Sequence, residues 1–240
     1  MSFLPLENLR SSAYDLGIEL SDSQLRQFDE FAALLVEANK RLNLTRITEP
    51  EEIITSHFMD SLTTLSALDI APNANVIDVG TGAGFPGVPI KIVRPDISIT
   101  LLDATQKKLD FIREAVEQLE LQNVELVHAR AEDIGHKAKY RERYDIAYAR
   151  ALSEMKVLAE LCLPLVRVGG HLVAQKSENI DEEVKSAKPI IGQLGGITEK
   201  IVRTTIPGTD IVRQLIVIVK AKPTPAQFPR HYSKIVKSKC

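Results

Sequence analysis

The chain has 240 residues, with 30 Lys and Arg against 32 Asp and Glu and 44% apolar side chains. This composition predicts one large globular domain or a domain with a modest extension, and it excludes collagen-like and low-complexity chains. No apolar run approaches the roughly 20 residues that a membrane-spanning helix needs, and no secretory leader is visible. The two cysteines, Cys162 and Cys240, suit a reducing compartment. We therefore expect a cytoplasmic protein with no membrane contact and no metal site.

The charge is distributed unevenly along the chain. Between Lys220 and Cys240 lie six basic residues and no acidic one, whereas the preceding residues carry an acidic excess. A basic tail over residues 223–240 predicts contact with a polyanion. A solvated tail that only aids solubility is the alternative reading of the same residues.

Residues 1–68 follow a helical pattern. Ser21 to Gln24 resembles a capping box, and apolar residues recur at helical spacing from Leu25 onward. Pro50 stands where the first turn of another helix is expected, and that helix should continue to Leu62. These features predict an N-terminal helical extension.

Short β-branched runs alternate with amphipathic segments from Asn75 onward. The alternation predicts an α/β, Rossmann-like domain over residues 69–222, with a seven-stranded, mostly parallel sheet covered by helices on both faces. The last two strands are separated by four residues, Pro207 to Asp210, which are too few for a crossover helix. One antiparallel edge strand is therefore expected. The predicted strands are 76–79, 97–103, 124–128, 144–150, 171–175, 197–205 and 211–219, and the predicted helices between them are 88–94, 106–119, 155–165 and 181–194.

A glycine-rich loop, Asp78-Val79-Gly80-Thr81-Gly82-Ala83-Gly84-Phe85-Pro86-Gly87, follows the first predicted strand. Glycines at this point permit a tight strand-to-helix turn and a close approach of ligand to backbone. Asp103 ends the second predicted strand, where a carboxylate can bind both ribose hydroxyls of a nucleoside, although it can also cap the next helix. The loop suits an NAD(P)-dependent oxidoreductase or an S-adenosylmethionine-dependent methyltransferase, and the Asp-x-Gly-x-Gly-x-Gly form favours the methyltransferase.

The type of methyl transfer is indicated by what the sequence lacks. Cys162 lies in an apolar helical run, so it does not resemble the nucleophile that C5-pyrimidine methylation requires. After the fourth predicted strand, Ala149 to Leu152 replaces the Asp/Asn-Pro-Pro-aromatic turn that exocyclic amine methylation commonly uses. A ring nitrogen such as guanine N7 already has a free lone pair, and positioning alone can supply most of the acceleration.

These residues resemble the bacterial 16S rRNA guanine-N7 methyltransferases known as RsmG or GidB, the glucose-inhibited division protein B family. The resemblance extends from about Ser21 to Arg230, and the block from Asp78 to Gly87 matches the family's cofactor loop, including the unusual Phe85-Pro86-Gly87. After Arg230 the family's usual Gly/Pro-rich ending is replaced by His231-Tyr232-Ser233-Lys234. The other matching blocks are Asn43-Leu44-Thr45, His57 to Leu62, Arg130-Ala131-Glu132, Tyr144-Asp145, Arg150-Ala151, Pro164-Leu165, Gly169-Gly170, Lys176 and Phe228-Pro229-Arg230.

The resemblance implies a class I methyltransferase that uses S-adenosylmethionine to methylate guanine N7 in 16S rRNA of the small ribosomal subunit, near the decoding centre, at guanine 527 in the usual rRNA numbering. An oxidoreductase and a catalytically inactive rRNA-binding protein of the same fold are the alternatives. The expected partner is 16S rRNA or the small subunit, and we expect a monomer.

The expected site residues form two groups. The resemblance places Gly80, Phe85, Ala131, Glu132 and Arg150 at the cofactor, and the loop argument adds Asp78, Gly82, Gly84 and Asp103. Arg150 is also expected to orient substrate, with pairing to Asp145 or Glu154 as the alternative. The residues expected at the RNA are Asn43, His57, Asp60, Lys107, Lys108, Lys176 and Arg230. For His57 and Asp60 a hydrogen-bond network between domains is an equal alternative.

Overall fold

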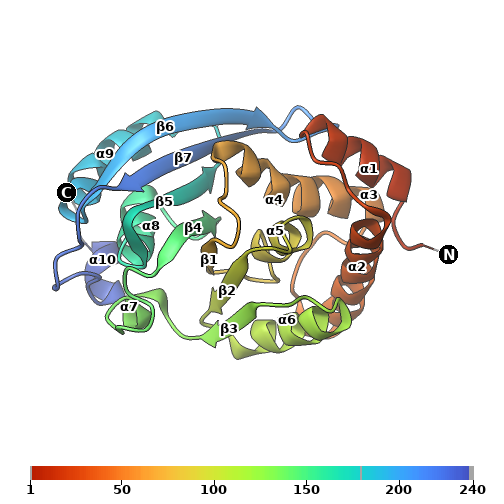
Figure 1. The fold of residues 1–240 in the computed structure, drawn as a ribbon, viewed down its shortest axis with the longest axis horizontal. Coiled ribbons are helices and arrows are strands. Elements are labelled where there is room, and N and C mark those ends of the chain that lie inside the picture. The colour runs from red at the N-terminus through yellow and green to blue at the C-terminus, as the bar shows by residue number, and fades with distance from the viewer. Residues whose placement is uncertain (1, 179, 238–240) are drawn as a thin grey trace.

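A computed structural model describes residues 2–178 and 180–237. Its centre is one seven-stranded sheet with the strand order β3-β2-β1-β4-β5-β7-β6 (Figure 1). Lys239 and Cys240, which belong to the predicted tail, lie outside the described residues. The strands are β1 (Asn75–Val79), β2 (Ser98–Asp103), β3 (Val124–His128), β4 (Tyr144–Arg150), β5 (Val166–Lys176), β6 (Gly196–Thr205) and β7 (Val212–Lys220).

The predicted fold class is confirmed, with one correction to the sheet. Strands β1 to β5 pair in parallel, and β7 pairs antiparallel with both β5 and β6. The antiparallel strand is therefore β7, which lies one position in from the edge, and β6 is the edge strand. The short turn after β6 forces an antiparallel neighbour, as expected, and β7 occupies the position between β5 and β6.

Helices cover both faces of the sheet. They are α5 (Gly87–Val93), α6 (Gln106–Gln118), α7 (Ala131–Ile134), α8 (Met155–Cys162) and α9 (Asp181–Gln193). Alternate residues of one strand face opposite apolar clusters: Val76 packs with the cluster that includes Phe111 of α6, and Ile77 with the cluster that includes Leu158 of α8. This period of two is what a strand buried on both faces requires.

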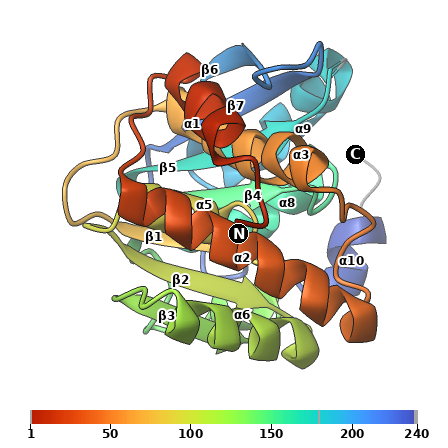
Figure 2. The ribbon, with the colours of Figure 1, turned by 90° about the vertical axis from the view of Figure 1, so that its right-hand side faces the viewer.

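The N-terminal helices share a core with the sheet. They begin with α1 (Leu6–Asp15) and α2 (Asp22–Leu42), and the predicted capping box is present because Ser21 and Gln24 each accept a backbone N–H from the other. Figure 2 shows α2 crossing the molecule on the side of α5 and α6, and its Phe28 and Phe31 are fully buried. The following helical segment consists of α3 (Pro50–Ile53), the π-helix η1 (Ile54–Met59), α4 (Asp60–Leu62) and the 3₁₀-helix η2 (Thr63–Ala67).

The basic tail contains a short helix that the sequence pattern did not predict, α10 (Tyr232–Lys237). Lys220, counted above with the tail, is the last residue of β7 and is fully buried. Its ammonium group donates to the carbonyl oxygens of Leu163 and Val166, so this lysine takes no part in a basic surface. Within residues 2–178 and 180–237, none of the helices combines the length and apolar character needed to cross a bilayer.

Candidate functional site

The glycine loop leaves β1 at the carboxyl edge of the sheet. Gly80, Gly82 and Gly84 all have positive φ angles, between 62° and 96°, a region that side chains other than glycine rarely adopt. The N–H groups of Gly80 and Thr81 donate to Leu102 O at 2.8 and 3.0 Å, which ties the loop to the end of β2. The conformation of the loop thus explains why glycine occupies these positions.

Asp78 holds the loop from inside the core. Its carboxylate is fully buried, and Oδ2 accepts the Gly87 N–H at 2.9 Å. Burial raises the pKa of Asp78 to about 6, against the lowering effect of the Gly87 hydrogen bond. The structure thus gives Asp78 a contact within the loop, and its predicted contact with the cofactor stays a prediction.

Three adjoining cavities follow the carboxyl ends of the parallel strands. The first measures about 190 Å³ and is lined by residues at or just after the ends of β1, β2, β3 and β4. The second, about 240 Å³, lies over the glycine loop and shares Gly80 with the first. The third, about 400 Å³, shares His57 and Arg150 with the second. Parallel sheets bind their ligands at this edge, so the three cavities are the candidate site.

The first cavity brings together four of the residues predicted at the cofactor. Gly80, Asp103, Ala131 and Glu132 line it, among apolar side chains that include Leu152. The Asp103 carboxylate also accepts the N–H of Gly82 at 3.0 Å and that of Thr105 at 2.8 Å. Asp103 therefore orders the loop as well as facing the cavity. The N-cap of α6 is Thr105, so the alternative that Asp103 caps this helix is wrong, and its contact with ribose stays a prediction.

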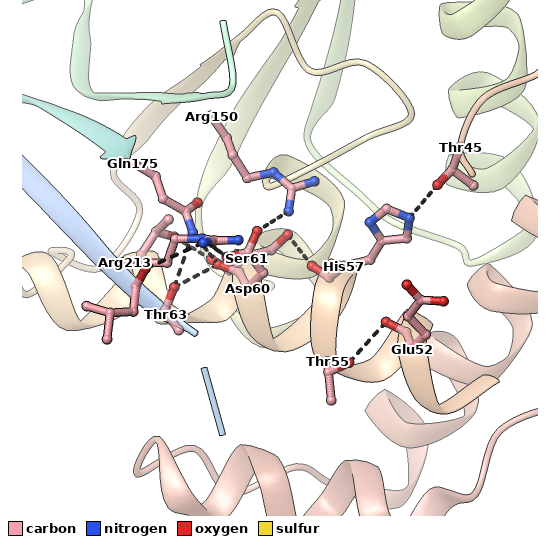
Figure 3. A network of polar contacts seen from close by, with 12 residues as sticks. Thr45, Glu52, Thr55, His57, Asp60, Ser61, Thr63, Arg150, Gln175 and Arg213 are labelled. Carbon is pink, nitrogen blue, oxygen red and sulfur yellow. Dashed lines mark hydrogen bonds and ion pairs between the residues drawn. The ribbon is translucent and has the colours of Figure 1, made fainter. Parts of the chain in front are cut away.

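Asp60 lies at the centre of a buried polar network beside the third cavity (Figure 3). Its Oδ2 accepts Nη1 of Arg150 at 2.8 Å, and its Oδ1 accepts Nε of Arg213 at 2.7 Å. The Gln175 amide donates to the same Oδ1 at 2.7 Å and to the Asp60 carbonyl oxygen at 2.8 Å. For Asp60 the geometry matches the network alternative, and Arg150 pairs with Asp60 instead of Asp145 or Glu154.

His57 lies between this network and the glycine loop. Its ring stacks on Phe85 with centroids 4.5 Å apart, and its Nε2 is 2.8 Å from Thr45 Oγ1. The guanidinium of Arg150 lies over the Phe85 ring, with its Cζ 5.2 Å from the ring centroid. Burial, followed by the charge of Arg150, lowers the pKa of His57 to about 4. The imidazole is therefore neutral at physiological pH.

The remaining residues predicted at the RNA have different environments. Asn43 ends α2 in the left-handed conformation, with φ 50°, which accounts for an asparagine there. Lys108 lines the second cavity, whereas Lys107 is exposed on the first turn of α6. Lys176 lines the third cavity and pairs with Glu183 at 2.6 Å.

Arg230 contacts protein where an RNA phosphate was predicted. Its backbone N–H and its Nε donate to Oε1 of Glu160, and Nη2 donates to Oε2 at 2.6 Å. Glu160 is fully buried. A buried carboxylate requires such a partner, so Arg230 has a contact within the protein, and its predicted contact with RNA stays a prediction.

Comparison with known proteins identifies the family. The family described as rRNA small subunit methyltransferase G (GidB) matches residues 24–211. A ribosomal RNA small subunit methyltransferase G of Desulforamulus reducens is 46% identical over 222 residues, 92% of each chain. A second, from Clostridium perfringens, is 43% identical over 95% of this chain and 96% of its own. The chain belongs to this family.

Two solved structures share the fold of this chain. TrmN from Thermus thermophilus covers 70% of the chain, which spans 53% of that protein, with a TM-score of 0.53 and 19% identity. M. jannaschii TYW2, solved in complex with AdoMet, covers 66%, and the chain spans 72% of it, with a TM-score of 0.52 and 13% identity. The architecture is that of class I methyltransferases, which use S-adenosylmethionine.

The first two cavities fit that cofactor. A carboxylate, Asp103, faces apolar walls beside the loop, and the space in front of Gly80 is narrow, because a Cβ there would lie 2.5 Å from Leu152 Cδ1.

Three residues at the cavities were not predicted from the sequence. Gln175 and Arg213 line the third cavity, and Tyr232 lines the first. Arg213 is distant from the recognised motifs in sequence, and no local pattern marks it.

Proposed function

We propose that this protein methylates guanine N7 in 16S rRNA of the small ribosomal subunit, near the decoding centre, at guanine 527 in the usual numbering. The observation that carries the proposal is the continuity of the cavities. The first cavity, lined by Asp103, adjoins the second through Gly80, and the second adjoins through His57 and Arg150 the larger third cavity, which cationic side chains line. Cofactor and polyanionic substrate would thus meet at the carboxyl edge of the sheet.

The cofactor would occupy the first and second cavities. We assign the Asp103 carboxylate to the ribose hydroxyls and the Ala131-Glu132 segment to the adenine edge, since both face the first cavity. Gly80 and Gly82, which lack side chains, would let the amino-acid end approach the backbone closely in the second cavity. Phe85 and Arg150 also line that cavity, where the reacting methyl group is expected.

Positioning is the chemistry that these residues support. S-adenosylmethionine supplies an electrophilic methyl group, and N7 of guanine needs no deprotonation before it attacks. The rigid stack of His57 on Phe85 and the ion pair of Arg150 with Asp60 would hold the base and exclude water. Because the pKa of His57 is about 4, the ring can pack against a base without carrying a positive charge.

The third cavity would receive the RNA. Arg150, Arg213 and Lys176 place three cationic groups around it, and Asp60 offsets part of their charge. Cationic side chains in this arrangement suit a nucleotide with its phosphate. Lys107 and Lys108, on α6, would extend the contact to neighbouring phosphates.

The N-terminal helical segment would form one wall of the RNA site. His57 and Asp60 come from this segment, whereas the glycine loop and Arg150 come from the sheet. We therefore divide the chain into an N-terminal extension over residues 1–68, a methyltransferase domain over 69–222 and a tail over 223–240, in a protein that acts as a monomer.

The test is methyl transfer from labelled S-adenosylmethionine to 16S rRNA and to small subunits that lack this modification, followed by mass mapping of the RNA. Label at guanine 527, in RNA that is cleaved there by a treatment specific for N7-methylguanine, supports the proposal. Label at another base or on protein contradicts it. Calorimetric titration with S-adenosylmethionine, NAD and NADP in parallel separates the methyltransferase from the oxidoreductase, and cofactor binding without label transfer would indicate the inactive RNA-binding protein.

A further inference from the structure

The first cavity has one wall that comes from the tail. Tyr232, the first residue of α10, lines this cavity together with Asp103 and Glu132. The other lining residues lie between Val79 and Leu161 in the sequence. Figure 1 shows α10 beside α7 and α8, at the side of the molecule where α7 follows β3. The tail thus returns to the carboxyl edge of the sheet.

Buried contacts fix α10 in this place. Glu160 of α8, which is fully buried, accepts three hydrogen bonds from Arg230, two residues before Tyr232. Ile235, one turn after Tyr232, is 4% exposed and packs in the apolar cluster of α8 and α9. His136, just after α7, contacts the Pro229 carbonyl oxygen through Nε2 at 2.7 Å. The position of Tyr232 is therefore determined by the core on both sides of it.

These contacts leave part of Tyr232 exposed to solvent. The residue is 37% exposed, in contrast to its buried neighbour Ile235. A half-exposed aromatic ring at the wall of a cavity has a free surface that a planar ligand can cover, and stacking of a base on such a ring is sequence-independent and favourable. The apolar side chains of Leu102 and Leu161 face the same space.

We propose that Tyr232 is a cofactor-binding residue that covers the adenine of S-adenosylmethionine. The inference rests on the proposed function, because Asp103 at the ribose and Glu132 at the adenine edge identify this cavity as the adenosine end. Tyr232 would close the outer side of the adenine against the apolar inner wall. The tail would thus act in cofactor binding, and the Arg230–Glu160 pair would hold Tyr232 in position.

The experiment is calorimetric titration of the full chain and its variants with S-adenosylmethionine and, separately, with adenosine, which lacks the amino-acid end. Tyr232→Ala is expected to raise both dissociation constants by about tenfold, in line with the loss of one stacked ring. Tyr232→Phe should retain the affinity of the wild type, since it keeps the ring. Val236→Ala is the matched control, because Val236 is 49% exposed on the same short helix and does not line the cavity.

The outcomes separate this inference from the proposed function. If the wild-type chain binds no S-adenosylmethionine, the proposed function fails. If it binds and Tyr232→Ala binds equally well, the role of Tyr232 is overturned. A loss for S-adenosylmethionine without a loss for adenosine would also overturn it, because the ring would then contact the amino-acid end. Tyr232→Leu, which keeps apolar bulk, provides a second variant should the alanine variant fail to fold, and it is expected to lose affinity for both ligands.

Discussion

Arg150 and Asp60 form an ion pair, 2.8 Å between Nη1 and Oδ2, that joins the end of β4 to the N-terminal helical segment. Both side chains are largely buried, with 16% and 7% of their surface exposed. Because Arg150 also lies over Phe85, the same guanidinium connects that segment to the glycine loop. The position of the loop therefore depends on residues that come before the sheet in the chain.

Asp60→Asn is expected to lower the free energy of unfolding by about 3 kcal/mol, since two largely buried guanidinium groups lose their anion. Urea denaturation at pH 7 measures the change. Asp22→Asn is the control, because Asp22 pairs with Arg10 at the same 2.8 Å but on the surface, with 77% of the Asp22 side chain exposed. Exposed pairs contribute little, so equal losses in the two variants would contradict the central role given to Asp60.

Gly80→Ala and Gly208→Ala form a second matched pair. Gly80 and Gly208 have φ angles of 77° and 75°, so each alanine variant should lose about 1 kcal/mol of stability from backbone strain alone. Only at Gly80 would the new Cβ meet a neighbour, Leu152 Cδ1 at 2.5 Å, whereas nothing lies within 4 Å at Gly208. Leu152 can avoid the methyl group only by moving in the cavity it lines. S-adenosylmethionine affinity, measured by calorimetry, should therefore fall at least tenfold in Gly80→Ala and stay unchanged in Gly208→Ala.

Local sequence patterns were sufficient to find the seven strands, although β5 begins five residues before the predicted 171–175 and the antiparallel strand is not at the edge. The predicted bounds 124–128 and 144–150 coincide with β3 and β4, because β-branched runs end at turn residues and each strand carries its own signal. The glycine loop could also be predicted from the sequence, because the positive φ angles at positions 80, 82 and 84 favour glycine, which stands at all three. Both kinds of inference need only neighbours in the chain.

The third cavity could not be predicted from local sequence patterns. Arg213 is 153 residues from Asp60 in sequence, and it reaches Asp60 only because β7 inserts beside β5, with Gln214 opposite Lys176. That register is a property of the whole sheet. Arg230 likewise resembled a tail cation until the fold placed the buried carboxylate of Glu160 against it. Charged side chains are poorly predicted from sequence because their partners come from distant strands and helices.

The double variant Lys107→Ala and Lys108→Ala is expected to weaken binding of 16S rRNA and to reduce its salt dependence. Each lost phosphate contact should lower the slope of log affinity against log salt by about 1. Filter binding between 50 and 200 mM salt measures that slope. Lys185→Ala on α9 is the control, since its side chain is 74% exposed and its helix packs beside the opposite edge strand β6. An unchanged slope in the double variant would remove α6 from the RNA interface.

His57 predicts how stability depends on pH. Its pKa is about 4 in the folded protein and about 6.5 in the unfolded chain, so between these values the unfolded state binds more protons. Stability from this group is therefore full above pH 6.5, falls as the pH drops towards 4, and levels off below that. Asp78 has the opposite sign, because its raised pKa of about 6 stabilises the folded state as the pH falls.

A comparison of variants separates the two groups. The free energy of unfolding of the wild type minus that of His57→Gln should decrease from pH 6.5 to pH 4 by up to about 3 kcal/mol, since one pKa unit corresponds to about 1.4 kcal/mol. The same subtraction with His128→Gln, at an exposed histidine at the end of β3, is the control. Urea titrations at half-unit pH steps measure both. A difference for His57→Gln that does not vary with pH would show that the ring is not held neutral between Thr45 and Phe85.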